Sequence, residues 1–193
     1  MMLFQHVRSK TLAAVFALIA LAGSALAFAA NEKVLLQTSM GAIELELYPD
    51  KAPITVANFL KYVDSGYYDG VIFHRVIQDF MVQAGGYDAK LKARVPNAAI
   101  VNESKNGLKN VIGAVSMARL SAPDSATAQF FINVADNTEL DFRPGRPGYT
   151  VFGEVTSGLD VVNVIAAVKT SAAGSMEDVP VEPVVILSAR RVK

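Results

Sequence analysis

The sequence predicts a mainly β domain in which short antiparallel strands close into a barrel and two helices cover its ends. Three observations support this fold class. Short strand-like segments recur along residues 33–193, with Gly, Asn or Pro between most of them. Only two segments carry apolar residues at helical spacing, and no repeat, low-complexity tract or linker interrupts the chain. Closure into a barrel would leave none of these strands with an unpaired edge.

The first two expected strands, 34–38 and 43–47, are joined by a turn that ends at Gly41. In the second strand, apolar residues alternate with Glu44 and Glu46, which predicts one buried face and one face in water. Two carboxylates could also form an acid–base pair. However, residues two apart on a strand share a face in any case, so the solvated face is the expected reading.

A helix is expected to begin at Ala52-Pro53 and to end at Gly66, which would act as a left-handed cap. The apolar side chains that recur at 3.6-residue spacing within it are Val56, Phe59, Leu60 and Val63. A second helix fits residues 159–168, with Leu159, Val162 and Ile165 on one face. The remaining expected strands are 71–77, 80–84, 111–118, 130–134, 149–155 and 184–189.

The N-terminus has the three parts of a secretory signal peptide. Two basic residues precede an apolar run over 12–22, and the small-residue sequence Ser-Ala-Leu-Ala closes it at 24–27. The run is too short to span a bilayer, which takes about 20 apolar residues. We therefore expect segment 1–27 to be cleaved, leaving an exported domain, 28–193, without stable membrane association. The candidate cleavage sites are Ala27, which is preferred, Ala29 and Ala30.

Charge and composition exclude several classes of function. Arg8 and Lys10 are the only charged residues before position 32, so the exported part carries a small acidic excess, and nucleic acid is not expected as a partner. The chain has no Cys, which excludes disulfides. With His6 in the signal segment, His74 is the only remaining histidine, so a Cys/His zinc site cannot be built. No Gly-x-Ser-x-Gly motif accompanies His74, and we expect neither a metal nor a cofactor.

The segment FHRVIQDFMVQAGG, residues 73–86, is predicted to form a strand, a tight turn and a second strand. Phe73 and Arg75 are expected to share one face of the first strand, and Met81 and Gln83 one face of the second. Such a hairpin would set a guanidinium beside a thioether, an amide and an aromatic ring. From the residues alone, a solvated Arg above core Phe and Met side chains is the commoner explanation.

This segment resembles the signature of the cyclophilins, whose pattern is close to Phe-His-Arg-x-Ile-x-x-Phe-Met-x-Gln-x-Gly. Three further blocks match that family in order and spacing, and the resemblance runs from about residue 34 to the C-terminus. These blocks are GAVSMA at 113–118, QFFI at 129–132 and VFGEV at 151–155. The resemblance implies an eight-stranded antiparallel barrel with two capping helices. It also implies peptidyl-prolyl cis–trans isomerase activity, with a substrate groove on the outer wall of the barrel.

The spacing within residues 133–141 and the export signal resemble the bacterial periplasmic branch of the cyclophilins. This resemblance implies a periplasmic location and a role in folding exported proteins. The expected partners are proline-containing polypeptides, and the protein is expected to be a monomer. An alternative is a chaperone-like module that holds proline-containing segments and isomerises them weakly. An intact Arg75 favours the enzyme, because a pure binding module has no use for a transition-state donor.

The resemblance assigns roles to individual residues. Arg75 matches the arginine that donates a hydrogen bond to the prolyl nitrogen in the twisted transition state. The residues that would line the apolar proline pocket are Phe80, Met81, Phe131, Leu140 and Tyr149. The groups that would bind the peptide backbone are Gln83, Ala118 and Arg119, with Gln129 supporting the groove. His74 is expected to orient neighbouring backbone rather than to perform acid–base work.

This sequence departs from the common family pattern at three places. Glu139 stands where many members carry a tryptophan that is associated with tight cyclosporin binding, so weak binding of that drug is expected. Arg119 replaces a frequent Asn, and its charge is expected to bias the residue that precedes proline. Gln78-Asp79 replaces a common Pro-Gly turn, which is expected to hold Phe80 less rigidly.

Overall fold

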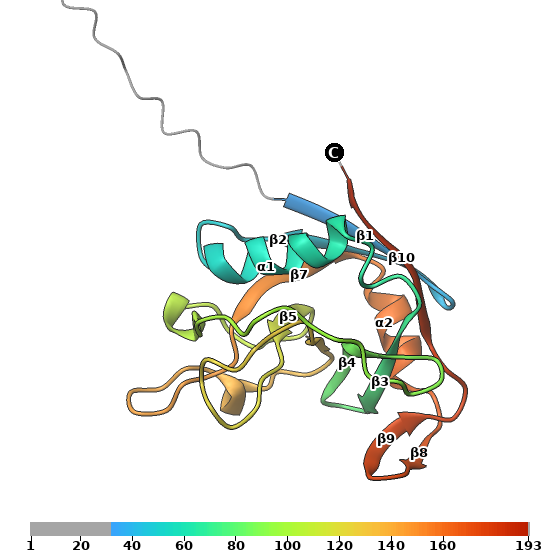
Figure 1. Ribbon diagram of the computed structural model, residues 1–193. Helices are drawn as coiled ribbons and strands as arrows, with labels where there is room; N and C mark the ends of the chain where they lie inside the picture. The colour runs from blue at the N-terminus through green and yellow to red at the C-terminus, as the bar shows by residue number, and fades with distance from the viewer. Residues whose placement is uncertain (1–31, 193) are drawn as a thin grey trace, which may run out of the picture.

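The computed structural model of the chain describes residues 32–192, so the expected signal segment, 1–27, lies outside the described residues. Eight strands close into one barrel, in the order β1-β10-β3-β4-β6-β5-β7-β2, and every neighbouring pair is antiparallel (Figure 1). The predicted fold class is therefore confirmed. The barrel strands are β1 (Glu32–Thr38), β2 (Gly41–Leu47), β3 (Val71–Ile77), β4 (Met81–Asp88), β5 (Ala114–Met117), β6 (Phe130–Asn133), β7 (Val151–Ser157) and β10 (Val185–Val192).

Two α-helices pack their apolar faces onto the barrel. Helix α1 (Pro53–Asp64) begins with proline in its first turn, where the missing N–H costs no helical hydrogen bond. Gly66 follows its C-terminal cap with φ of 67°, the left-handed conformation that was predicted there. Helix α2 (Leu159–Ala166) buries Val162 and Ile165. Two short 3-10 turns, η1 (Ser104–Asn106) and η2 (Thr138–Leu140), lie in the loops.

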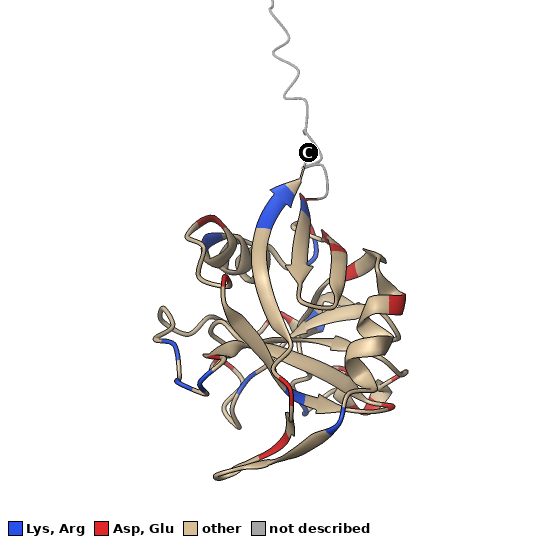
Figure 2. Cartoon of the chain, turned by 90° about the vertical axis from the view of Figure 1, so that its right-hand side faces the viewer, with Lys and Arg blue, Asp and Glu red and all other residues tan. Residues whose placement is uncertain are grey.

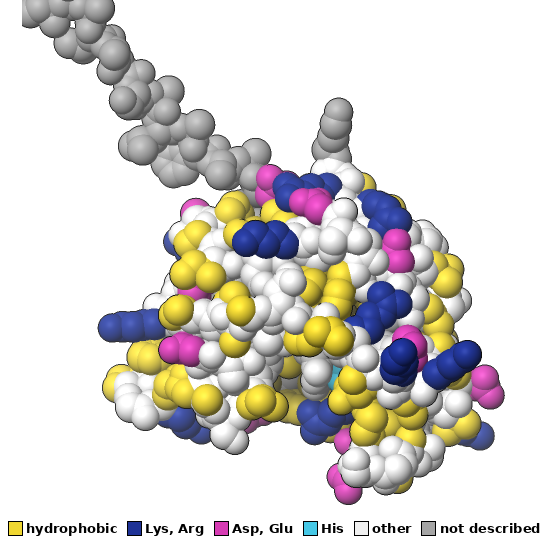
Figure 3. All heavy atoms as spheres, in the orientation of Figure 1, with side chains coloured by type: hydrophobic (Ala, Val, Ile, Leu, Met, Phe, Trp, Pro, Cys, Tyr) yellow, Lys and Arg dark blue, Asp and Glu magenta, His cyan; other side chains and the backbone are white. Residues whose placement is uncertain are grey.

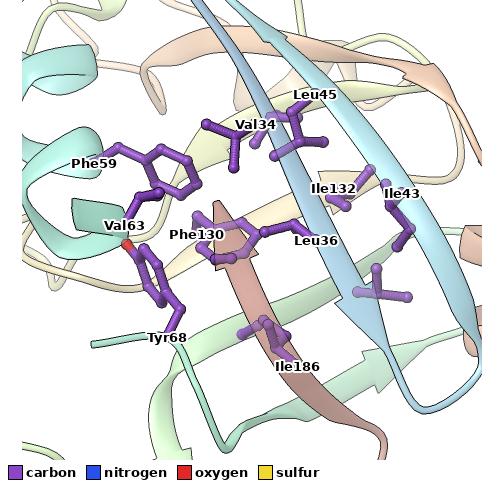
Figure 4. Packing of buried hydrophobic residues seen from close by; sticks show 14 of the residues in the cluster. Val34, Leu36, Ile43, Leu45, Phe59, Val63, Tyr68, Phe130, Ile132 and Ile186 are labelled. Carbon is purple, nitrogen blue, oxygen red and sulfur yellow. The ribbon is translucent and has the colours of Figure 1, made fainter. Parts of the chain in front are cut away.

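The interior of the barrel is filled by alternate side chains of its strands together with the inner face of α1 (Figure 4). Phe59 of α1 packs against three aromatic rings of this interior. Its ring centroid lies 5.2 Å from that of Tyr68, 5.3 Å from that of Phe130 and 5.1 Å from that of Phe152. All four side chains are fully buried, so they carry much of the area that stabilises the fold.

One hairpin was not expected from the sequence. Strands β8 (Thr170–Ala173) and β9 (Met176–Pro180) pair with each other outside the barrel, and the hairpin projects from the wall beside β3 (Figure 1). Strand β8 is short and largely exposed, so it lacks the alternation of apolar and polar residues that predicts a strand. The turn depends on Gly174, whose φ is 62°.

Charges of both signs are scattered over the barrel and are interspersed with apolar side chains on the surface (Figures 2 and 3). Glu44 accepts a hydrogen bond of 2.8 Å from the Nζ atom of Lys33, and this bond lowers the pKa of the carboxyl group. The partly exposed Glu44 thus faces a cation, as a solvated strand face predicts. Within residues 32–192, no helix is long and apolar enough to cross a membrane.

Candidate active site

A β-bulge in β3 changes which of its side chains point into the barrel and which point outward. Phe73 pairs with Ala84 but Arg75 pairs with Gln83, so one extra residue, His74, is inserted into β3. Phe73 is fully buried in the core, whereas Arg75 turns outward with 43% of its side chain exposed. The prediction that Phe73 and Arg75 share a face is therefore wrong. Regular alternation fails here because the bulge shifts the strand by one position.

Strand β4 keeps its alternation, as predicted. Val82 and Ala84 belong to the core, and Met81 and Gln83 point to the outside of the barrel. Gln83 pairs in register with Phe131 of β6, which also points outward. Neighbouring strands therefore present their functional side chains side by side on one outer surface.

These side chains open onto a cavity of about 270 Å³ on the outer wall. Strands β3, β4 and β6 supply part of its lining, and the segments around β5, η2 and β7 supply the rest. The lining residues are Arg75, Phe80, Met81, Gln83, Ala118, Arg119, Phe131, Leu140 and Tyr149. The structure thus gathers in one cavity every residue that was predicted for the site except Gln129. A larger cavity of about 350 Å³ beside Tyr48 and Glu154 contains none of them.

Gln129 lies directly behind the cavity wall. Its Oε1 atom accepts a hydrogen bond of 2.8 Å from Nε2 of Gln83, so it fixes the side chain that faces the cavity. Gly86 leaves room for this contact, because a Cβ atom there would lie 2.7 Å from Nε2 of Gln129 and the amide would have to shift. The structure therefore places Gln129 as a support of the lining.

His74 lies behind the same wall and is almost fully buried. Burial lowers its pKa to about 4, while hydrogen bonds to the Gln129 side chain and the Ile72 backbone oppose the shift. Its ring packs 4.8 Å from that of Tyr87, and its Nδ1 atom has no hydrogen-bond partner. At pH 7 this buried imidazole is neutral and contacts Gln129, so it supports the wall and lacks the acidic proton of an imidazolium.

The turn that carries Phe80 closes without a glycine. Asp79 adopts the left-handed conformation with φ of 58°, which Asp tolerates better than most residues. The Phe80 amide donates to the Ile77 carbonyl at 3.2 Å. In turn, the Phe80 carbonyl accepts from the Val134 amide at 3.0 Å and from Nδ2 of Asn137 at 2.8 Å. Three hydrogen bonds therefore hold the backbone of Phe80 at the cavity.

Arg119 and Tyr149 form another part of the cavity wall. The Arg119 guanidinium lies 4.6 Å from the centre of the Tyr149 ring, and that ring meets Phe131 edge-on at 5.6 Å. The same guanidinium donates to the carbonyls of Leu120, Pro147 and Gly148 at 2.9–3.2 Å. Its charge is thus engaged by backbone carbonyls at the rim of the cavity.

Sequence reasoning missed two residues of the site. Asn137 anchors Phe80, and Asp178 of β9 places its Oδ2 atom 3.9 Å from Nε of Arg75. Both contacts join segments far apart in the chain, so no local spacing could have predicted them. In the part of the chain that the structure describes, no three His, Asp or Glu side chains gather closely enough to hold a metal ion.

Comparison with known proteins agrees with this geometry. Residues 33–191 match the family described as cyclophilin type peptidyl-prolyl cis-trans isomerase/CLD. The chain is 50% identical over 186 residues to peptidyl-prolyl cis-trans isomerase A of Dickeya dadantii, covering 95% of this chain and 98% of that protein. It is 49% identical over 158 residues to peptidyl-prolyl cis-trans isomerase B of Escherichia coli, covering 80% of this chain and 96% of that protein.

Solved structures show the same fold. A cyclophilin type peptidyl-prolyl cis-trans isomerase of Cryptosporidium parvum matches with a TM-score of 0.68 at 24% identity, covering 84% of this chain and 98% of that chain. A cyclophilin of Hirschia baltica matches with a TM-score of 0.66 at 25% identity, covering 83% of this chain and 73% of that chain. From the family match, the curated relatives and the fold together, the chain belongs to the cyclophilin-type peptidyl-prolyl cis-trans isomerases and shares their enzymatic activity.

Proposed function

We propose that this isomerase accelerates X–Pro bond rotation in exported polypeptides, with Arg75 as the donor that stabilises the transition state. One observation carries the proposal: a single cavity sets the Arg75 guanidinium beside an apolar surface made by Phe80, Met81, Phe131 and Leu140. A proline ring needs an apolar pocket, and its rotating amide needs a donor at the edge of that pocket. The cavity supplies both.

The chemistry explains why one fixed guanidinium suffices. Rotation about an X–Pro bond breaks amide resonance against a barrier of roughly 18–20 kcal/mol. In the twisted transition state, the prolyl nitrogen becomes pyramidal and gains a lone pair, which the planar ground state lacks. A donor aimed at that nitrogen binds the transition state more strongly than the substrate, which is the condition for acceleration. The guanidinium is a planar donor with several N–H groups, so it can donate to the prolyl nitrogen without a proton being transferred.

The remaining cavity residues are proposed to hold the substrate. Gln83, fixed by Gln129, is aimed to hydrogen-bond the peptide backbone. The Ala118 amide already donates to the Gln129 carbonyl at 3.0 Å, so the Ala118 carbonyl and the Arg119 backbone are proposed to pair with the residues preceding proline. A structure of the Cryptosporidium parvum relative was solved in the presence of the dipeptide Ala-Pro, which supports proline-containing peptides as ligands of this fold. No bond is made or broken in the reaction, so none of these groups needs to act as a nucleophile.

The export of the protein, and hence the class of its substrates, is supported by the N-terminal sequence. A basic start, an apolar run over 12–22 and a small-residue ending at Ala27 direct a chain to the secretory pathway. We propose cleavage after Ala27 and a periplasmic location. N-terminal sequencing of the protein recovered from a periplasmic extract tests this, and a chain that retains its first residues in the cytoplasmic fraction would contradict it.

The catalytic role is tested by comparing Arg75→Ala with Phe131→Ala, in a prolyl isomerisation assay and in a peptide-binding assay. Arg75→Ala is expected to lower turnover at least tenfold and to leave peptide affinity nearly unchanged. Phe131→Ala is expected to lower both, because it removes part of the pocket. If Arg75→Ala retains normal turnover, the assigned role is wrong. If it loses binding in step with turnover, the alternative of a binding module with weak isomerase activity is favoured.

A further inference from the structure

The hairpin of β8 and β9 brings a carboxylate to Arg75. Oδ2 of Asp178 lies 3.9 Å from Nε of Arg75, and the two side chains are 39% and 43% exposed. Strand β9 packs against β3, so this proximity is built into the packing of the hairpin against the barrel wall. Acidic segments are visible on the hairpin, which projects at the bottom of Figure 2.

The backbone of the hairpin is irregular at the position that makes this contact. Ser171 pairs with Val179 and Ala173 pairs with Met176, so β9 carries one residue more than β8 between these pairs. Asp178 lies in this bulge with φ of 58°, a conformation that few residues other than Gly, Asn and Asp adopt readily. The neighbouring Val179 is buried and anchors the strand. The bulge therefore aims the Asp178 side chain from a fixed base.

We propose that Asp178 is a positioning residue for the isomerase reaction, which holds the Nε edge of Arg75 so that the Nη atoms stay available to the cavity. This role rests on the proposed function of Arg75. A long Arg side chain on an exposed wall has many rotamers, and each wrong one removes the donor from the prolyl nitrogen. An ion pair on the Nε side restricts the rotamers without occupying the end of the fork.

Two effects of the carboxylate oppose each other. It orients the guanidinium, which raises the rate, but it also offsets part of the positive charge that the transition state uses. Because both side chains are partly exposed, water screens both effects. The orienting attraction acts over the 3.9 Å between Oδ2 and Nε, whereas the offset of charge has to act across the guanidinium on the prolyl nitrogen. The orienting effect is therefore expected to prevail. Exposed ion pairs are weak, so we expect its loss to lower the rate by about two- to fivefold.

Asp178→Asn tests this role, because Asn keeps the size of the side chain and tolerates the left-handed backbone while removing the charge. Glu177→Gln is the matched control, since it removes the same charge from the adjacent, exposed residue of the hairpin. Exchange NMR on a proline peptide gives the isomerisation rate at saturation and the Kd separately. Asp178→Asn is expected to lower the rate about two- to fivefold with an unchanged Kd, and Glu177→Gln is expected to change neither.

A double-mutant cycle and one spectroscopic signal separate positioning from a structural role. In an Arg75→Ala background, Asp178→Asn should have no further effect on the rate. The ¹⁵N–¹H signal of the Arg75 Nε group should shift or broaden in Asp178→Asn and not in Glu177→Gln. A rate loss that persists in the Arg75→Ala background, or a full rate with an unmoved Nε signal, overturns the positioning role. Normal turnover of Arg75→Ala would instead overturn the proposed function itself.

Discussion

Phe130 and Phe131 are neighbours in one strand, and both are nearly inaccessible to solvent, at 0% and 4% exposure. Their surroundings are nevertheless different. Phe130 points inward, with its ring against Phe59 and Tyr68, whereas Phe131 points outward and meets Tyr149 at the cavity. The comparison shows that exposure alone does not distinguish a core residue from a site residue. The face of the strand on which the side chain lies distinguishes them.

The same division holds along β4. Val82 and Ala84 complete the core, and Met81 and Gln83, the residues between and beside them, line the cavity. A barrel wall one strand thick thus stabilises the fold with one face and lines the cavity with the other, where the proposed function places the substrate. Substitutions on the inner face should change stability and leave the chemistry of each folded molecule intact. Substitutions on the outer face should change the chemistry and leave stability largely intact.

The largest expected effect is that of Phe130→Ala. It removes a fully buried ring that packs against Phe59 and Tyr68, and the surrounding barrel can relax only partly into the space. We expect the free energy of unfolding to fall by about 3–5 kcal/mol, as for other buried Phe→Ala changes. Urea unfolding followed by circular dichroism measures this loss.

Phe131→Ala is the matched control for that change. Its space opens onto the cavity, where water can enter, so the loss of stability should be less than half that of Phe130→Ala, and peptide affinity should fall instead. Equal losses of stability in the two variants would contradict the division into an inner and an outer face.

His74 is the extra residue of the bulge in β3, and its lowered pKa leads us to expect that stability depends on pH. The unfolded chain binds a proton at His74 near the ordinary pKa of 6.5, but in the folded chain the pKa is about 4. As pH falls from about 7 to 4, the unfolded state therefore gains a proton that the folded state does not. The free energy of unfolding should decrease by up to about 3 kcal/mol over this range and should stay constant above it.

The matched variant for this prediction is His74→Gln, which cannot titrate. Its unfolding free energy should be nearly flat between pH 7 and 5, and losses below that range should come from carboxylates such as Asp69, whose pKa is lowered by Arg190. Parallel curves for the two proteins would show that His74 is not held neutral. The measurement is urea unfolding at a series of pH values.

The smallest expected effect concerns the outer face, where Arg119 stacks on Tyr149. A double-mutant cycle with Arg119→Lys and Tyr149→Leu, measured by urea unfolding, should give a coupling energy of about 0.5–1 kcal/mol in the free energy of unfolding. The reason is that Lys keeps the charge but lacks the planar guanidinium that stacks on the ring. A coupling near zero would show that the two side chains form the cavity wall independently.

Much of the fold could be predicted from the sequence, because the barrel strands and both helices follow regular periodicities. The alternation in 43–47 and the helical spacing from Val56 to Val63 are examples. The β8–β9 hairpin was missed because both strands are short and β8 is mostly exposed. The shared face of Phe73 and Arg75 was wrongly predicted because a bulge at His74 breaks the period, and the short apolar pattern of this strand does not reveal where the extra residue lies.

The candidate site depended on the resemblance rather than on periodicity. Phe131, Leu140 and Tyr149 lie far from Arg75 in the chain, and only the closed barrel brings them to one cavity. Their roles in the reaction remain predictions. Asp178 and Asn137 could not be inferred from the sequence at all, because each acts through a contact between distant segments.

The rate of bound-state isomerisation tests the central claim most directly. Exchange NMR on a saturating X–Pro peptide should show that Arg75→Ala lowers the rate at least tenfold, while its Kd and its free energy of unfolding stay close to those of the unmodified protein. This result would place the chemistry on the outer face alone. An unchanged rate in a folded, peptide-bound Arg75→Ala protein would contradict the account.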